Sequence, residues 1–359
     1  MNATAIRAIV LSTCLAVTPL AAGQAASNTW NSKTAAAYLD ERAGWWMDSS
    51  IAARDHGTFC VSCHTAVPYA LARPSLRGLL AEESASGNEQ KLVDNVRKRV
   101  RMWQEVEPFY KGDPKSDESR GTEAILNALI LANAGARLSD DTRLAFDNMW
   151  ALQQKNGAWI WLDFHNAPWE AGDSQYYGAV LAALAVGTAP GNYRSLPAIQ
   201  DKLKLLCGYL NENGDKQSLV NRIVLLWAST KVPGLLTSAQ QESIVTEALS
   251  KQADDGGWSL ASIVGTWKRR DGTPLETKGD GYATGLVTFV LQQAGLSCEQ
   301  SKLQRGLAWL VNNQNRTEGN WPGYSLNKQR DRSHVAWLFM SDAATAYAVM
   351  SLTQAAAGR

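Results

Sequence analysis

Five consecutive residues carry the clearest chemical signal in the sequence: Cys60, Val61, Ser62, Cys63 and His64. This C-x-x-C-H spacing is typical of covalent attachment of a c-type haem, in which two thiols add to the two vinyl groups of one porphyrin. The histidine that follows reaches the iron from one face, so His64 is the expected proximal ligand. The pattern predicts one covalent haem c held by Cys60, Cys63 and His64.

The same thiols are open to other interpretations. A disulfide could join Cys60 to Cys63 across their short loop, or the two thiols could act as a redox pair. Together with His64 they could also bind zinc. We favour haem, because a chance match to the whole motif is improbable in a chain with only four histidines and five cysteines.

Four acidic residues are the candidates for proton transfer, and each lies near the expected start of an apolar helix. They are Glu123, Asp173, Asp280 and Asp342. A carboxylate in that position accepts hydrogen bonds from free backbone N–H groups, and we favour this capping role. The functional alternative is a carboxyl group that faces an apolar cavity with a raised pKa and protonates an alkene or an alcohol.

Four tyrosines follow the same helix starts at a distance of about one turn. They are Tyr176, Tyr177, Tyr282 and Tyr347. Their ring faces could line a cavity and stabilise a cation, although aromatic residues at helical spacing are more often ordinary core.

Helices have to position these residues, because strand signals are nearly absent. Six segments rich in Ala, Leu, Val and Tyr predict helices buried on nearly all sides, and they begin at Cys63, Gly121, Gly172, Asp215, Gly279 and Ser341. A more charged, amphipathic segment precedes each one and predicts an outer helix: 33–54, 89–103, 140–154, 196–210, 238–252 and 299–313. Such pairs close into a ring, so we predict an all-α fold, a six-pair α/α toroid, as a single domain over 27–359.

All four histidines fall in segments that lead into inner helices: His56, His64, His165 and His334. Because the inner helices should all start at one end of the ring, that end is predicted to be the mouth of the central cavity. His334 or Met340 is the candidate sixth ligand of the iron, since both precede the last inner helix, which should neighbour the first. His56 and His165 are weaker candidates, and an exposed loop position is the alternative for His334 and His165.

The chain has 14 Trp, more than its 10 Tyr or 6 Phe, and a repeated motif accounts for part of this excess. A Gln, a short spacer, a Gly, any residue and a Trp recur at 154–159, 252–258 and 314–321. We interpret the motif as structural: the Gln bonds freed carbonyl groups at a helix end, the Gly makes a left-handed turn and the indole packs against the amide.

These Gln-Trp motifs resemble the repeats of the squalene-hopene cyclase and protein prenyltransferase superfamily, over residues from about 120 to 355. The resemblance implies an α/α toroid whose central cavity holds isoprenoid chains. The catalytic motifs of that superfamily are missing: there is no Asp-x-Asp-Asp string, no aspartate-rich diphosphate motif, and no Cys or His beside Asp280 and Asp342 to complete a zinc site. The resemblance therefore implies the fold and not the reaction.

Residues 1–26 have the three parts of a secretory signal peptide: Arg7, an apolar stretch, and small residues before a cleavage site near Ala25. We therefore expect a periplasmic or secreted protein without a later membrane-spanning segment. A net charge of +1 makes nucleic acid an improbable partner. Cys207 and Cys298 should lie at opposite ends of the ring, so no disulfide is expected between them.

Three functions remain open. The first is an exported haem c protein that transfers electrons, or oxidises a hydrophobic, isoprenoid-like ligand, with a redox partner. The second is a haem-free lyase, isomerase or cyclase-like enzyme acting on isoprenoids with Cys, His and Asp groups at the mouth of the cavity. The third is a non-catalytic binding toroid with a Cys60–Cys63 disulfide. Whether the protein is an enzyme stays open.

Overall fold

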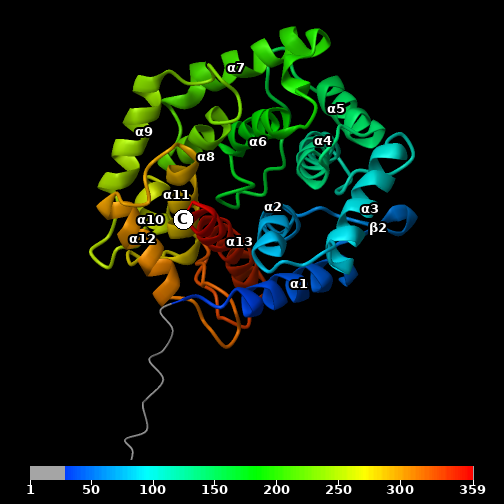
Figure 1. Ribbon diagram of the computed structural model, residues 1–359. Helices are drawn as coiled ribbons and strands as arrows, with labels where there is room; N and C mark the ends of the chain where they lie inside the picture. The colour runs from blue at the N-terminus through cyan, green and yellow to red at the C-terminus, as the bar shows by residue number, and fades with distance from the viewer. Residues whose placement is uncertain (1–28, 359) are drawn as a thin grey trace, which may run out of the picture.

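The computed structural model describes residues 29–358, so the predicted signal peptide at 1–26 lies outside the described residues. The chain alternates between an outer and an inner ring of helices (Figure 1). The outer helices are α1 (Ser32–Asp48), α3 (Gly87–Arg101), α5 (Asp140–Ala151), α7 (Gln200–Gly214), α9 (Ser238–Ser250) and α12 (Ser301–Asn312). The inner helices are α2 (Ala66–Leu79), α4 (Lys115–Ala134), α6 (Ser174–Thr188), α8 (Leu219–Ser229), α11 (Gly281–Gln293) and α13 (Val335–Ala357).

Ring closure comes from contacts between the first and the last inner helices. Each inner helix packs against the next one along the chain, and α13 then packs against both α11 and α2. The predicted six-pair α/α toroid is therefore confirmed. The remaining elements are short: a hairpin of β1 (Ala53–Arg54) and β2 (Thr58–Phe59), the helix α10 (Leu260–Ile263), and 3-10 turns at Asp55–Gly57, Tyr193–Ser195 and Pro197–Ile199.

The inner helices are apolar because they have neighbours on every side. In α6, every residue from Tyr176 to Val186 is buried. Among the described helices, only α13 is long and apolar enough to cross a membrane, and 78% of its apolar window is buried inside the ring. The expectation that no later segment spans a membrane stays a prediction. The central position of α13, which demands apolar residues all round, explains its composition.

Several helix boundaries differ from the predicted ones. Helix α4 begins at Lys115 instead of Gly121, because charged residues in its first turns find partners: Lys115 pairs with Glu118, and Arg120 stacks over the Trp103 ring. Helix α13 begins at Val335, before Ser341, so Met340 lies inside the helix and not in the connection that precedes it. Helix α1 ends at Asp48, because the following residues form the hairpin.

The three Gln-Trp motifs have the predicted structural role. Each indole N–H donates to a backbone carbonyl in or just before the last turn of the preceding outer helix, from Trp159 to Met149, from Trp258 to Ala248 and from Trp321 to Leu310, at 2.6–2.7 Å. The three indoles are at most 1% exposed, and the motif glycines Gly157, Gly256 and Gly319 have positive φ.

The glutamine of each motif also reaches the start of the next outer helix around the ring. The Nε2 of Gln252 donates to the carbonyls of Gly256 and Lys302, and that of Gln314 donates to those of Gly319 and Asn31. In the first motif Gln153 makes the equivalent bonds, to Gly157 and Lys202, so Gln154 was the wrong residue.

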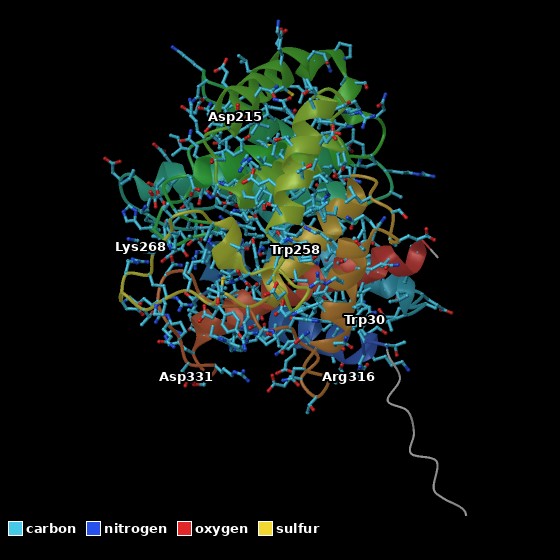
Figure 2. All side chains as sticks on the ribbon, turned by 90° about the vertical axis from the view of Figure 1, so that its left-hand side faces the viewer. Trp30, Asp215, Trp258, Lys268, Arg316 and Asp331 are labelled. Atoms are coloured by element: carbon cyan, nitrogen blue, oxygen red, sulfur yellow. The ribbon has the colours of Figure 1, made fainter. Side chains whose placement is uncertain are left out.

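The two faces of the ring differ in their connections. We call the face formed by the first turns of the inner helices and the connections leading into them the N-face, and the opposite one the C-face. The N-face connections are mostly long (49–65, 102–114, 152–173, 251–280 and 313–334), apart from 215–218. Those of the C-face are short: 80–86, 135–139, 189–199, 230–237 and 294–300. In the edge-on view, the long connections with Lys268 and Asp331 lie on one side and the end of α13 on the other (Figure 2).

Candidate functional site

The small hairpin delivers Cys60 to the N-face. Strands β1 and β2 pair antiparallel around a tight turn in which His56 and Gly57 have positive φ. After the hairpin, the N–H of Cys60 donates to the carbonyl of Ala52 at 2.7 Å, and the indole N–H of Trp46 donates to the carbonyl of Cys60 at 2.7 Å. The backbone of the first motif cysteine is therefore fixed from both sides.

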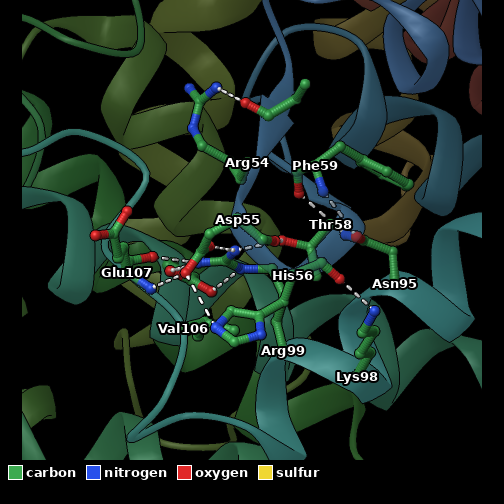
Figure 3. A network of polar contacts seen from close by, with 12 residues as sticks. Arg54, Asp55, His56, Thr58, Phe59, Asn95, Lys98, Arg99, Val106 and Glu107 are labelled. Atoms are coloured by element: carbon green, nitrogen blue, oxygen red, sulfur yellow. Dashed lines mark hydrogen bonds and ion pairs between the residues drawn. The ribbon is translucent and has the colours of Figure 1, made fainter.

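Helix α3 holds the hairpin against the ring (Figure 3). The Asn95 side chain bonds both backbone groups of Phe59, accepting from its N–H at 2.9 Å and donating to its carbonyl at 3.1 Å. Lys98 donates to the carbonyl of His56, and Arg99 donates to the Thr58 hydroxyl at 2.6 Å. The strand that leads to the cysteines is thus held by the side chains of one outer helix.

His64 belongs to a chain of hydrogen bonds that determines its tautomer. Its Nδ1 lies 2.8 Å from the Thr65 Oγ1, which lies 2.6 Å from the Asp342 Oδ2. Asp342 also receives two bonds from Arg42, at 2.8 and 3.1 Å, and one from the Tyr38 hydroxyl at 2.9 Å.

Burial raises the pKa of Asp342, and the bonds from Arg42, Thr65 and Tyr38 act in the opposite direction. The Thr65 hydroxyl donates to Asp342 Oδ2, so its oxygen accepts from His64 Nδ1–H. The lone pair of the imidazole is then on Nε2, the atom that a metal ion or a proton would take.

Aromatic side chains pack around His64. The Phe339 ring stacks on the imidazole with centroids 3.7 Å apart, Trp46 meets it edge-on at 4.8 Å, and Trp169 lies at 6.2 Å. Burial, with a smaller effect from the Arg42 charge, lowers the pKa of His64 to about 3. The imidazole is therefore neutral at ordinary pH, as a metal ligand or a general base has to be.

Both motif thiols are free and buried, with Cys60 5% and Cys63 4% exposed. The disulfide of the third hypothesis is thus not formed in this structure. Burial raises the pKa of Cys60 to about 12 and raises that of Cys63 as well. Thiols that stay protonated are poor nucleophiles, which weighs against a thiol redox pair in the folded protein.

Glu170 is a candidate that the sequence analysis missed. It lies in the long connection 152–173, and burial raises its pKa to about 7. Its charge raises the pKa of both motif thiols and of Tyr110, so the four groups share one region of the N-face. Since Glu170 follows Trp169 in a segment without periodic pattern, no sequence signal marked it as partly buried.

The four predicted acids have different surroundings. Asp280 caps α11 as expected, accepting from the N–H of Ala283 at 2.8 Å, and burial raises its pKa to about 7. Asp173 occupies the N-cap of α6 without a side-chain cap bond and accepts from Asn221 at 3.2 Å. Glu123 lies inside α4 and pairs with Arg99 at 2.5 Å, both fully buried. Asp342 lies inside α13 and contacts the motif through Thr65.

The four predicted tyrosines divide into two groups. Tyr176 points toward the outer ring, where its hydroxyl donates to the carbonyl of Leu210 at 2.9 Å. Tyr177, Tyr282 and Tyr347 form a buried group, with the rings of Tyr282 and Tyr347 5.2 Å apart. Burial is the main cause of the raised pKa of Tyr177. Smaller contributions come from the phenols of Tyr347 and Tyr282 and from the Cys63 thiol. These three tyrosines therefore extend the region of Cys63.

The candidate sixth ligands are not among the residues that bond or stack on the His64 ring, which are Thr65, Trp46, Trp169 and Phe339. His334 is exposed and caps α13, its Nδ1 accepting from the N–H of Ala336 at 3.0 Å. Met340 is buried, and it packs near Gly323. His56 and His165 are exposed and lie beside Asp55 and Asp163. His64 is thus the only histidine that the structure holds inside the described part of the ring.

The cavity that all six inner helices line does not open at the N-face. It has a volume of about 530 Å³ and is lined by their C-terminal ends, with Leu79, Asn133, Thr188, Lys231, Gln293 and Met350 among its residues. The predicted mouth was therefore at the wrong end. The long connections fill the N-face instead, with Trp161, Leu162 and Trp169 of 152–173 all buried.

A bare metal ion finds no ligand set in residues 29–358, where no three His, Cys, Asp or Glu side chains converge. This finding weighs against the zinc interpretation of Cys60, Cys63 and His64. It leaves haem open, because a porphyrin supplies four of the six iron ligands itself.

No protein-family model matches the chain, and no curated protein matches it. Solved structures share its architecture. A polysaccharide lyase superposes with a TM-score of 0.54 at 11% identity, over 91% of this chain and 98% of the lyase. A GH76 α-1,6-mannanase from Salegentibacter gives 0.53 at 12%, over 92% and 100%. A type II terpene cyclase from Scytonema gives 0.50 at 13%, over 91% and 97%. At such identities the likeness shows the α/α toroid fold alone.

Proposed function

We propose that the protein is an exported haem c protein, with the haem attached to Cys60 and Cys63 and ligated by His64 at the N-face. One observation carries the proposal: the chain from Asp342 through Thr65 to His64 leaves the imidazole lone pair on Nε2, beside two thiols at the attachment spacing. Metal-bound histidines commonly donate their other N–H to such an outer group, which orients the ring and makes it a better ligand. The two thiols and the Nε2 lone pair are thus the groups that covalent haem attachment and iron ligation require.

Haem, when bound, supplies one-electron chemistry or the activation of a small oxidant at an open sixth position. The residues of this chain set its surroundings. Asp342, Arg42 and Thr65 orient His64, while Phe339, Trp46 and Trp169 shield the imidazole from water. A hydrophobic, isoprenoid-like substrate and a redox partner remain the expected partners.

The burial of both thiols implies an order of events. Thiols that are 4–5% exposed and protonated do not react with an incoming vinyl group, so attachment has to precede the packing of Phe339 and Trp169 around the motif. Export in an unfolded state before haem attachment satisfies this requirement.

The test is the intact mass of protein exported from a host with cytochrome c maturation, together with its visible spectrum. We expect the mass of one added haem and a Soret band, both lost in Cys60→Ser/Cys63→Ser. His64→Ala should keep the covalent haem and change the spectrum, because the thioethers remain while the ligand is gone. An unmodified mass, with four thiols that alkylate after denaturation instead of only Cys207 and Cys298, would overturn the proposal.

A second function is favoured by Glu170. A partly buried carboxyl with a pKa of about 7, close enough to Cys63 to raise the pKa of that thiol, suits a haem-free lyase or isomerase that moves protons on an apolar substrate. In that case protein without haem should be active on isoprenoid alcohols, and Glu170→Gln should abolish turnover while Glu212→Gln on α7 should not. Activity confined to the haem-loaded fraction would exclude this function.

A further inference from the structure

The cavity of the C-face is not explained by the proposed function. Its volume of about 530 Å³ is typical of small-molecule sites, and apolar side chains from α2, α8, α11 and α13 form much of its wall. They include Leu71, Trp227, Phe289 and Met350. Such a wall binds an apolar ligand body by removing it from water.

Polar groups gather on one side of this cavity in a chain whose direction is fixed. The Nζ of Lys231 lies 2.8 Å from Gln293 Oε1, and Gln293 Nε2 lies 3.2 Å from Gln354 Oε1. Lysine only donates, so the oxygen of Gln293 has to face Lys231 and its amide N–H₂ has to face Gln354. Each side-chain oxygen in the chain already accepts one bond. The free donors that face a ligand are the remaining N–H bonds of Lys231 and the N–H₂ of Gln354.

Two further observations indicate an absent acceptor. The indole N–H of Trp227, a cavity residue only 6% exposed, has no hydrogen-bond partner among the described residues. Within residues 29–358 the Lys231 ammonium bonds the neutral side chain of Gln293 and no Asp or Glu, and burial lowers its pKa. A buried N–H without a partner and a half-buried ammonium without a counterion are both costly, and an anionic acceptor would relieve both costs.

We propose that this cavity binds an amphipathic carboxylate: its hydrocarbon body against Trp227, Phe289 and Met350, and its carboxylate against the Nζ of Lys231. The carboxylate oxygens supply the acceptors that Lys231, Gln354 and Trp227 lack. The site is separate from Cys60, Cys63 and His64, which lie on the N-face, so it stands whether or not haem is attached.

Lys231 also has a purely structural alternative. It follows Ser229, the last residue of α8, where a cation favourably meets the negative end of the helix dipole. That role predicts a loss of stability without Lys231 and no preference among ligands. The two roles therefore differ in a binding measurement.

The test measures dodecanoate binding to the full exported chain by titration calorimetry, with methyl dodecanoate as the neutral control. We expect the acid to bind at least about tenfold more tightly than the ester, and Lys231→Met to remove this difference, as for loss of a charged hydrogen bond. Lys231→Arg should keep most of it. Because the acid–ester comparison needs no variant, a Lys231→Met protein that fails to fold leaves the proposal testable.

Gly78 provides the test of location. It lines the cavity near the end of α2, and a Cβ there would meet no atom within 4 Å. Gly78→Trp should therefore fill the cavity without a backbone clash and abolish binding, whereas Gly78→Ala should bind normally. Equal affinity for acid and ester, no binding of either, or unchanged binding by Gly78→Trp would overturn the proposal.

Discussion

The N-face and the C-face are built from opposite ends of the same six inner helices, yet one is filled and the other holds a cavity. At the N-face, long connections bury their own aromatic residues, and the carboxylates of Glu123 and Asp342 pair with Arg99 and Arg42. At the C-face the connections are short, and among the described residues Lys231 bonds the neutral Gln293 side chain and no acidic one. The comparison teaches that connection length, more than the helix sequences, decides which end of the ring is filled.

The largest expected effect tests the buried charges of the N-face. Arg99→Met removes the nearer of the two arginines that pair with the fully buried Glu123, leaving only Arg120 at 3.8 Å, and should lower the free energy of unfolding by about 3–5 kcal/mol. Arg101→Met, on the exposed side of the same helix, should change it by less than about 1 kcal/mol. Urea unfolding measures both. Equal effects of the two substitutions would contradict the distinction between buried and surface pairs.

The next effect depends on pH. The pKa of Glu170 is raised from 4.5 to about 7 by burial, so between these values the folded protein holds a proton that the unfolded chain releases. Stability from this group is present at low pH and is lost as pH rises from about 4.5 to 7. At about 1.4 kcal/mol per unit, Glu170→Gln should gain about 3 kcal/mol relative to the wild type between pH 4.5 and pH 8.

Asp280, whose pKa is also raised to about 7, contributes equally to both proteins, so the difference isolates Glu170. Urea unfolding across this pH range provides the measurement. Parallel stability profiles for the wild type and Glu170→Gln would show that Glu170 is not buried.

A pair of glycines compares the packing of the two faces directly. A Cβ on Gly178 would lie 2.2 Å from the Trp161 ring, so Gly178→Ala should destabilise by about 1–3 kcal/mol. At the C-face, Gly78→Ala meets open space and should stabilise by about 0.5–1 kcal/mol through helix propensity. Thermal unfolding of both variants gives the comparison, and shifts of the same sign would contradict it.

The smallest effect sharpens the chemistry of the N-face. Thr65→Val removes the hydroxyl that joins His64 to Asp342 and should cost about 1 kcal/mol. In haem-free protein, nitrogen NMR of the imidazole should show the Nδ1–H tautomer of His64 in the wild type and in Thr65→Ser. A mixture of tautomers is expected in Thr65→Val. The same tautomer in all three proteins would mean that the threonine does not set it.

The fold was predictable because each inner helix is apolar on all sides and each outer helix is not. The predicted helix boundaries were wrong where tertiary contacts determine the helix end. The charged start of α4 is helical because Lys115 and Arg120 find partners. In the candidate site, the motif Cys60–His64 was predictable from the sequence, because its residue spacing is recognisable on its own. The partnership of Asp342 with Arg42 joins residues 300 positions apart, and no local pattern encodes it. The partial burial of Glu170 depends likewise on how a long connection folds over the N-face.

The third Gln-Trp motif has a consequence for synthesis of the chain. Gln314 exchanges hydrogen bonds with the backbone of Asn31 at the start of α1, and Trp321 packs against Trp30. Helix α13 then fills the space between α2 and α11. The first helices translated therefore cannot complete their native contacts until the last ones are made. Native contacts of such long sequence separation form slowly. A ribosome or a translocation channel that still holds the last 25 or so residues keeps the ring open, which gives a window in which Cys60 and Cys63 are accessible.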